Sequence, residues 1–381
     1  MKRLVVDYIK EHPDTWKADL AKIGIRISDS HPKLMLLKYG KDNSDFSNPI
    51  VRECRGLVLE KGTLDVVSVS FDKFFNLGEP NCAEIDWPSA KVTQKMDGSL
   101  VTLFWYDGKW DLKTNGAIDA RDVQTPSNPK KSLYDLFLEA ERKQPIGWDL
   151  LNKDECYSFE LMAPENRVII EYPEPMIRFL MARNRVTGEE LDYSQDNNPT
   201  GVVMPMSYPC HTLQDCLDMI EGWDHDGRKD IEGFVVCDKF HRRMKIKTRA
   251  YVTAHYLRGE MTMTVKNAIK IIRDGDETEF VTYSPWRKEF MADVRTRYEK
   301  LVSTIGKICD EVGAVKAENG DADPREVRRA VVALVASRPA WSKCFYFAAL
   351  DGKIGNQKEY ADSLSESRVE AIIENEEFKN G

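Results

Sequence analysis

The sequence lacks long hydrophobic runs. No stretch approaches the ~20 apolar residues of a membrane-spanning helix, so we expect a protein that does not cross a membrane. The eight cysteines are scattered singly without a CxxC pair, and none of the six histidines forms an HxxxH pair. This distribution argues against a disulfide framework and against a zinc site, and it predicts reduced thiols in a cytoplasmic protein.

The sequence also lacks an excess of positive charge, internal repeats and low-complexity segments. A net charge of −8 excludes wholesale coating of nucleic acid but is compatible with a local basic cleft. The length of 381 residues predicts two or three domains. A hydrophobic content of 42% is typical of a globular protein with a sizeable core.

Strand patterns fill the first two thirds of the chain, and helical periodicity follows them. Strands are predicted at 34–39, 55–60, 64–69, 100–106, 110–114, 157–162, 168–170, 177–182, 231–236 and 243–247, with helices near 131–142 and 212–221. Later helices are predicted at 251–259, 264–274, 286–312, 324–337 and 363–376. We therefore expect an α+β protein with an N-terminal domain at 1–250 and an all-α C-terminal domain at 251–381.

Two helix starts in the C-terminal region have recognisable signals. Asp323 is a candidate N-cap, with Pro324 at the first helical position. Ser363-Leu364-Ser365-Glu366 has the spacing of a capping box and predicts a helix that begins after Ser363.

The most informative stretch is Lys95-Met96-Asp97-Gly98-Ser99, which joins a short apolar-flanked run to a predicted strand. The turn would aim the amine of Lys95 across the mouth of a sheet. An amine is a nucleophile only in its uncharged form, which burial or nearby cations favour. On its own, the pentapeptide fits a surface hairpin better than a site.

Four further charged residues supply what a nucleophilic lysine requires. Glu160 and Glu232 each lie within an apolar run, and Lys245 and Lys247 share one face of a predicted strand. The two lysines would stabilise a phosphate, while the glutamates would hold a divalent cation or contact a ribose. Singly, each acid fits an edge strand facing water, and the lysine pair fits a solvated strand face. In one cleft with Lys95, they suit transfer of a phosphoryl group to an amine.

The order and spacing of these residues resemble the covalent nucleotidyltransferases. Glu160 lies 65 residues after Lys95, and Glu232 lies 72 residues further on. The segments that resemble motifs I, III, IV and V of that superfamily are Lys95-Met96-Asp97-Gly98, Ser158-Phe159-Glu160, Ile231-Glu232-Gly233-Phe234-Val235 and Met244-Lys245-Ile246-Lys247.

Three other segments look like the RNA-ligase-1 family of T-even bacteriophages, namely Glu53-Cys54-Arg55-Gly56, Lys73-Phe74-Phe75-Asn76 and Ala163-Pro164-Glu165-Asn166-Arg167. The resemblance covers roughly residues 34–256. It implies an adenylation domain built on antiparallel sheets with flanking helices, and the helical C-terminal domain fits the architecture of that family.

The resemblance also implies roles for individual residues. Lys95 would be the nucleophile that receives AMP, Glu160 would lie near the ribose or a metal, and Glu232 near the metal. Lys245 and Lys247 would grip the α-phosphate.

Further family positions are matched, with one departure. Arg55 and Lys73 correspond to the nucleotide and phosphate site, Tyr251 lies just beyond the last motif, and Phe179 lies on the strand that floors the adenine pocket. The chain departs from the family at Asn115, where a lysine is common, and Lys113 is a candidate substitute.

By this resemblance we expect an ATP-dependent RNA ligase that joins 5′-phosphate and 3′-hydroxyl ends, with ATP and Mg²⁺ or Mn²⁺ as cofactors. Its partners would be single-stranded RNA ends or a nicked tRNA anticodon loop during phage infection, and we expect a monomer. The alternatives are a catalytically silent RNA-binding protein and a DNA ligase or capping enzyme. The last two usually continue with a β-barrel after motif V, whereas helices are predicted here.

Overall fold

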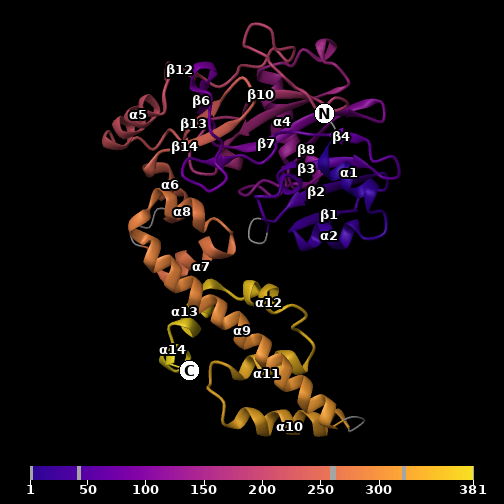
Figure 1. The fold of residues 1–381 in the computed structure, drawn as a ribbon, viewed down its shortest axis with the longest axis vertical. Helices are drawn as coiled ribbons and strands as arrows, with labels where there is room; N and C mark the ends of the chain where they lie inside the picture. The colour runs from indigo at the N-terminus through magenta and orange to yellow at the C-terminus, as the bar shows by residue number, and fades with distance from the viewer. Residues whose placement is uncertain (1–2, 41–43, 258–262, 320–322, 381) are drawn as a thin grey trace. The chain divides into compact units, whose positions relative to one another are not determined.

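The computed structural model describes residues 3–40, 44–257, 263–319 and 323–380, which belong to two compact units, Met1–Gly259 and Glu260–Gly381 (Figure 1). Every strand within the described residues lies in the first unit, and the second unit is helical. The expected α+β class with antiparallel sheets is confirmed. Within the described ranges, no helix combines the length and the apolar character needed to cross a membrane.

The first sheet is antiparallel and follows chain order, with strands β1 (Ile25–Ser28), β2 (Leu34–Tyr39), β3 (Arg55–Glu60) and β4 (Val66–Ser68). Its core includes Leu36, Val58 and, from the first helix, Val5 and Ile9. The flanking helices are α1 (Leu4–Glu11), α2 (Trp16–Lys22) and α3 (Pro49–Glu53).

The second sheet is antiparallel in the order β11-β10-β9-β7-β8. Val101 and Phe159 on one face pack with Phe137 of the helix α4, whereas Phe104 and Cys156 on the other face join the core of the first sheet. Alternation along each strand therefore buries both faces. The elements are β7 (Ser99–Tyr106), β8 (Lys109–Thr114), α4 (Leu133–Lys143), β9 (Glu155–Met162), β10 (Met176–Asn184) and β11 (Glu190–Leu191).

The third sheet has the order β12-β6-β13-β14-β5, in which only the β14–β5 pair is parallel. Met244 and Ile246 are buried with Phe234 against the helix α5, while Lys245 and Lys247 share the opposite face of β14 as predicted. The elements are β5 (Phe75–Asn76), β6 (Lys91–Lys95), β12 (Ser207–Tyr208), α5 (Leu213–His225), β13 (Gly233–Cys237), β14 (Arg243–Lys247) and the following helix α6 (Arg249–Leu257).

The second unit is organised around the long helix α9 (Lys288–Asn319), whose buried side chains include Met291, Leu301 and Ile305. The other helices are α7 (Val265–Arg273), α8 (Glu277–Tyr283), α10 (Pro324–Ala336), α11 (Lys343–Leu350), α12 (Gln357–Ser363), α13 (Glu366–Ile373) and α14 (Glu376–Asn380). Short 3-10 turns occur in the two units at Trp87–Ser89, Ala120–Asp122, Trp148–Leu150, Pro164–Asn166 and Pro285–Arg287.

The two predicted helix starts have different outcomes. The Asp323 carboxylate accepts a hydrogen bond from the Arg325 backbone N–H at 2.8 Å, which confirms the N-cap. The capping box at Ser363 is wrong, because Ser363 ends α12 and the next helix is capped by Ser365. The sequence spacing of a capping box could not reveal that residues 357–363 already form a helix, which ends where the new helix was predicted to begin.

The predicted strand at 168–170 is also wrong. The backbone N–H groups of Ile169 and Ile170 donate to the side chain of Asp97 at 2.9 and 2.7 Å instead of to a neighbouring strand. Apolar residues alone predicted a strand here, but the segment is a loop held by a distant carboxylate.

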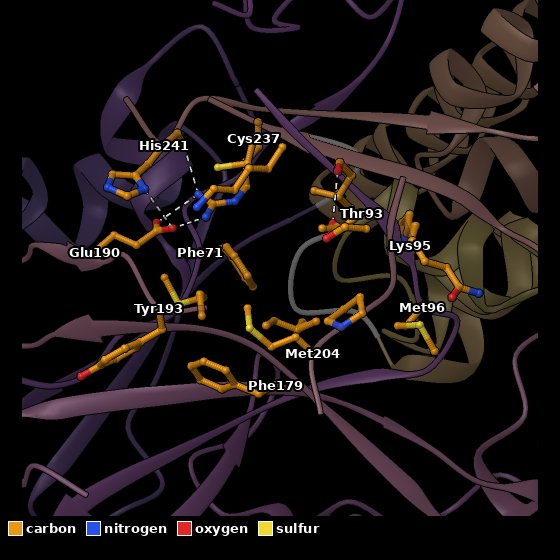
Figure 2. Close-up of a pocket in the computed structure, with 18 of the residues that line it drawn as sticks. Phe71, Thr93, Lys95, Met96, Phe179, Glu190, Tyr193, Met204, Cys237 and His241 are labelled. Atoms are coloured by element: carbon orange, nitrogen blue, oxygen red, sulfur yellow. Dashed lines mark hydrogen bonds and ion pairs between the residues drawn. The ribbon is translucent and has the colours of Figure 1, made fainter. Parts of the chain in front are cut away.

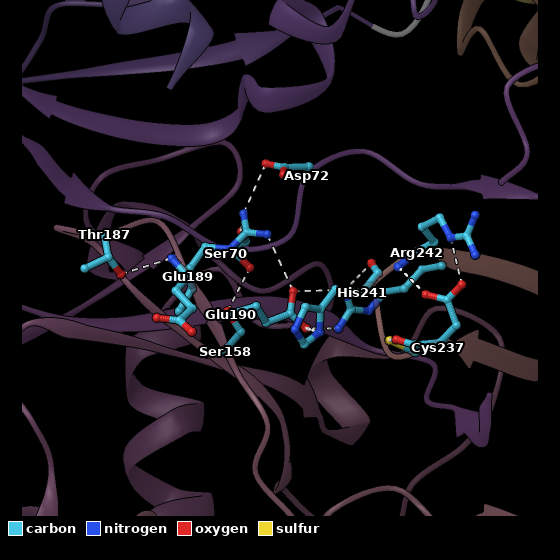
Figure 3. Close-up of polar contacts among 12 residues, drawn as sticks. Ser70, Asp72, Ser158, Thr187, Glu189, Glu190, Cys237, His241 and Arg242 are labelled. Atoms are coloured by element: carbon cyan, nitrogen blue, oxygen red, sulfur yellow. Dashed lines mark hydrogen bonds and ion pairs between the residues drawn. The ribbon is translucent and has the colours of Figure 1, made fainter. Parts of the chain in front are cut away.

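A buried ionic cluster centred on Glu190 joins the second and third sheets (Figure 3). The Glu190 carboxylate lies 3.5 Å from Arg183 of β10, 3.3 Å from the His241 ring, and forms an ion pair with Arg243 of β14. Arg183 also donates to Asp72 at 3.2 Å, in the segment between the first sheet and β5. Removing one member would leave buried charges without a partner.

We expect Glu190→Gln to lower the free energy of unfolding by about 3 kcal/mol at pH 7. Burial raises the pKa of Glu190, but the hydrogen bond from His241 and the charge of Arg243 outweigh it and lower the pKa to about 2. This contribution is complete above the ordinary value of 4.5 and is lost as the pH falls towards 2.

Thermal unfolding between pH 7 and pH 3 measures this difference. The exposed neighbour Glu189 provides the matched control, Glu189→Gln, which should retain the stability of the wild type. Equal stability of the two variants at pH 7 would contradict a structural role for the cluster.

Candidate active site

A cavity of about 840 Å³ lies between the second and third sheets. Figure 2 shows Phe179 and Tyr193 along one side of it, with Glu190 and His241 at the opposite end from Lys95 and Met96. The predicted site residues that line the cavity are Arg55, Lys95, Glu160, Phe179, Lys245 and Lys247. Side chains from distant parts of the chain therefore meet in one enclosed space.

Lys95 is the last residue of β6, and its amine lies beside a buried carboxylate. The Lys95 Nζ is 2.8 Å from the Glu232 Oε1, and the Lys247 Nζ is 3.4 Å from the same oxygen. Glu232 is 2% exposed and lies beneath the cavity lining. Its second oxygen, Oε2, has no hydrogen-bond partner within the described residues. An unpaired buried carboxylate oxygen is costly and favours binding of a cation.

Two glycines of the motifs permit close approach of the backbone. A Cβ atom at Gly98 would collide with the carbonyl oxygen of Leu161, and one at Gly233 would collide with that of Ile246. Gly233 also has a φ of +145°, which disfavours other residues. The close approach lets the Gly98 N–H donate to Glu160 Oε1 at 3.1 Å.

Glu160 occupies an environment that disfavours its charged form. Burial raises the pKa of its carboxyl group to about 7, with the charge of Lys95 opposing that effect and the charge of Glu232 adding to it. Protonation of Glu160 or binding of a cation beside it would relieve this unfavourable effect.

Three cations at the cavity lie beside aromatic rings. The Lys245 amine lies 5.6 Å from the centre of the Phe74 ring, and the Arg55 guanidinium lies 5.2 Å from the same centre. The Lys247 amine lies 5.4 Å from the centre of the Tyr251 ring. These contacts between cations and aromatic rings help to position the three side chains at the cavity.

The sequence model of a protein family described as RNA ligase matches residues 53–251, which is more than half of the chain. The chain belongs to the RNA ligase family. The match includes all the residues of the cavity that were predicted from sequence.

Individual relatives agree with this assignment. The RNA ligase of Rhodothermus phage RM378 is 26% identical, and the alignment covers 96% of this chain and 97% of the phage protein. A protein of Autographa californica nuclear polyhedrosis virus, provisionally named a bifunctional polynucleotide kinase/RNA ligase, is 30% identical over 71% of this chain. This chain spans only 40% of the length of the viral protein.

Among solved structures, an archaeal ATP-dependent RNA ligase is 16% identical, with a TM-score of 0.44, and the comparison covers 92% of this chain and 99% of the archaeal one. A similarity at this level does not by itself carry a functional assignment.

Asp97, the acid of the segment that resembles motif I, holds the turn that follows Lys95. Its buried carboxylate accepts hydrogen bonds from Ile169 N and Ile170 N, and from the Tyr251 hydroxyl at 2.6 Å. Sequence reasoning missed this role, although Asp97 and Tyr251 both belong to quoted family positions. Nothing in the sequence places residues 169 and 170 next to residue 97.

Lys73, Lys113 and Asn115 are further predicted positions that lie away from the cavity lining. The Lys73 amine lies 5.1 Å from the centre of the Phe46 ring and 5.4 Å from that of Phe75, in an aromatic environment outside the lining. Lys113 is fully buried, and the backbone of Asn115 packs against Gly56. The roles of Lys73, Lys113 and Asn115 in catalysis stay predictions.

A metal site in this part of the chain would depend on Glu160 and Glu232. Within the described residues, no group of three or more histidine, cysteine, aspartate or glutamate side chains could hold a metal ion. The free Oε2 of Glu232 and the carboxylate of Glu160 fit a hard divalent cation that completes its shell with phosphate oxygens and water.

We expect Tyr251→Phe to lower the free energy of unfolding by about 2 kcal/mol, because it removes a hydrogen bond to a buried carboxylate. Urea denaturation measures the change. Tyr134→Phe is the matched control, since the Tyr134 ring stacks on Arg121 and its hydroxyl makes no hydrogen bond in the described part of the chain. Equal destabilisation by both variants would show that the Asp97 contact is not the cause.

Proposed function

We propose that the protein is an ATP-dependent RNA ligase that joins RNA 5′-phosphate and 3′-hydroxyl ends. One observation carries the proposal: the Lys95 amine lies at the edge of a nucleotide-sized cavity, 2.8 Å from a buried carboxylate, within the region that matches the RNA ligase family. Lysine, carboxylates and flanking cations are the parts that phosphoryl transfer to an amine requires.

In the first step, the Lys95 nitrogen attacks the α-phosphorus of ATP. A phosphorus–nitrogen bond forms, the bond to pyrophosphate breaks, and the amine loses a proton. Lys245 and Lys247 extend from β14 into the cavity, where they stabilise the charge that develops on the phosphate oxygens. Phe179 and Tyr193 provide an apolar side for the base.

Mg²⁺, or Mn²⁺ in its place, fits the pair of Glu160 and Glu232. When bound, such a cation would supply neutralisation of the phosphate charge. Glu232 holds the Lys95 amine in position through the 2.8 Å contact. The buried carboxylate thus keeps the nucleophile oriented before the reaction.

In the later steps, an oxygen of the RNA 5′-phosphate attacks the phosphorus of lysyl-AMP and releases the lysine. The RNA 3′-hydroxyl then attacks the activated 5′-phosphate, and AMP leaves. The same cations face the phosphorus throughout, so one cavity can serve all three steps.

The specific form of this proposal is a monomeric cytoplasmic enzyme that repairs cleaved tRNA anticodon loops in phage-infected bacteria, with RNA selection by residues 251–381. The full-length similarity to a phage RNA ligase supports a phage setting. The predicted catalytic residues all lie in the first unit, which supports a role in RNA selection rather than in catalysis for the helical second unit.

A DNA ligase or capping enzyme is the alternative with the same motifs. After β14, the described residues form helices and contain no strand, whereas those classes usually continue with a β-barrel. A silent RNA-binding protein is the other alternative, and it would have no need for the contact between Lys95 and Glu232.

Incubation with ATP and Mg²⁺ should add the mass of one AMP to the intact protein, and Lys95→Ala should abolish the adduct because the nucleophile is absent. Intact-mass spectrometry makes the measurement on protein first freed of pre-bound AMP. Lys109→Ala, at an exposed lysine of β8, is the control and should form the adduct as the wild type does. Folded wild-type protein without an adduct would contradict the proposed enzyme activity.

The acceptor can be tested separately with the adenylated protein. We expect a 5′-phosphorylated single-stranded RNA with a 3′-hydroxyl to be circularised or joined at least tenfold faster than the DNA strand of the same sequence, as judged by denaturing gels. Equal rates on RNA and DNA would favour the alternative of a DNA ligase. If the protein forms the AMP adduct but transfers AMP to neither strand, the protein would be an adenylating enzyme and the proposed ligase activity would be contradicted.

A further inference from the structure

Lys113 is a fully buried lysine in β8 that the proposed mechanism does not use. Its exposed fraction is 0%, and its amine has no hydrogen-bond partner within the described residues. Burying a charged or polar group without a partner is among the most costly arrangements in a protein interior. A lysine retained in this place is therefore a candidate for a functional role.

The neighbours on the sheet do not satisfy the amine. Lys113 pairs with Thr102 on β7, and Thr102 pairs with Ser158 on β9, so the three side chains share one face of the second sheet. The hydroxyl groups of Thr102 and Ser158 lie 3.2 Å apart, and Ser158 lies 2.7 Å from the Ser70 hydroxyl. These hydroxyls bond with one another and leave the amine without a partner.

Arg55, which lines the cavity, also has buried polar atoms without a hydrogen-bond partner among the described residues. These atoms are its Nε and Nη1, although its guanidinium packs on Phe71 and Phe74. The end of β8 packs closely here, because a Cβ atom on Gly56 would lie 2.7 Å from the backbone of Asn115. Arg55 lines the cavity, whereas Lys113 lies outside the lining, on the strand whose end packs against the residue that follows Arg55.

The surroundings of Lys113 affect whether its amine is protonated. Burial lowers the pKa of its amine to about 8, the Cys156 thiol on β9 acts in the opposite direction, and the charge of Arg55 on β3 adds to the lowering. A group of this kind is partly charged near pH 8. An anion placed in the cavity next to Arg55 would favour the charged form of the amine.

We propose that Lys113 is a positioning residue for nucleotide binding, whose buried positive charge supports Arg55 and whose amine takes up a proton when the nucleotide phosphates enter the cavity. The inference rests on the proposed ATP site. By linkage, a proton that nucleotide binding draws in also strengthens nucleotide binding. The low polarity of the interior keeps this interaction from being screened by salt.

Calorimetric titration tests the inference with α,β-methylene-ATP and Mg²⁺, because this analogue binds without transferring AMP. Titration at pH 8.5 in two buffers of different ionisation enthalpy measures proton uptake directly. The wild type should take up a fraction of a proton that Lys113→Met does not. The affinity of Lys113→Met should be about tenfold weaker at pH 7.5, where the lost charge is present in the wild type.

The pH profile separates a functional role from a structural one. Wild-type affinity should decline between pH 7.5 and pH 9.5, whereas the profile of Lys113→Met should be flatter, and Lys113→Arg should bind tightly with an equally flat profile. Lys109→Met, the same change at an exposed site of β8, should reproduce the wild-type profile and proton uptake.

Thermal unfolding completes the test. Lys113→Met should be at least as stable as the wild type below pH 8, because a buried charge is replaced by an apolar chain of similar volume. Wild-type affinity, profile and proton uptake in Lys113→Met would overturn the inference and leave the proposed function intact. A wild type that does not bind the analogue at all would overturn the proposed function and this inference together.

Discussion

The contact between Lys95 and the buried carboxylate of Glu232 is the interaction on which the site depends. The contact brings the end of β6 next to the start of β13, and the Glu232 oxygen also draws in Lys247 from β14. Burial makes the carboxylate a strong partner for cations, and its second oxygen is still unsatisfied. One buried group therefore positions the amines of Lys95 and Lys247.

The backbone around this contact leaves little freedom to the side chains. Gly98 and Gly233 allow strands to approach where any Cβ atom would collide with a carbonyl oxygen. Asp97 fixes the turn between Lys95 and β7 by accepting three hydrogen bonds from two distant segments. The cavity also has a rigid far end, because the Glu190 cluster joins its two walls. Such preorganisation is what a site for phosphoryl transfer requires.

The buried charges of the first unit fall into two kinds. Glu190 and Arg243 satisfy one another and connect the sheets, as expected of charges that stabilise a fold. Glu232 Oε2, Lys113 and Arg55 keep polar atoms without partners in the described residues, at or near the cavity. Polar atoms of the second kind cost stability unless a ligand satisfies them.

The sequence by itself determined the class of fold and the face shared by Lys245 and Lys247, because strand alternation is a local property. It also predicted, from motif spacing, that Lys95, Glu160 and Glu232 belong to one site. Only the tertiary structure decided which groups meet across the chain. It placed residues 169 and 170 in a loop bound to Asp97, placed Lys73 in an aromatic environment away from the cavity lining, and buried Lys113 without a hydrogen-bond partner among the described residues. The physical reason is that hydrogen bonds, ion pairs and burial depend on contacts between distant segments, which neither periodicity nor composition contains.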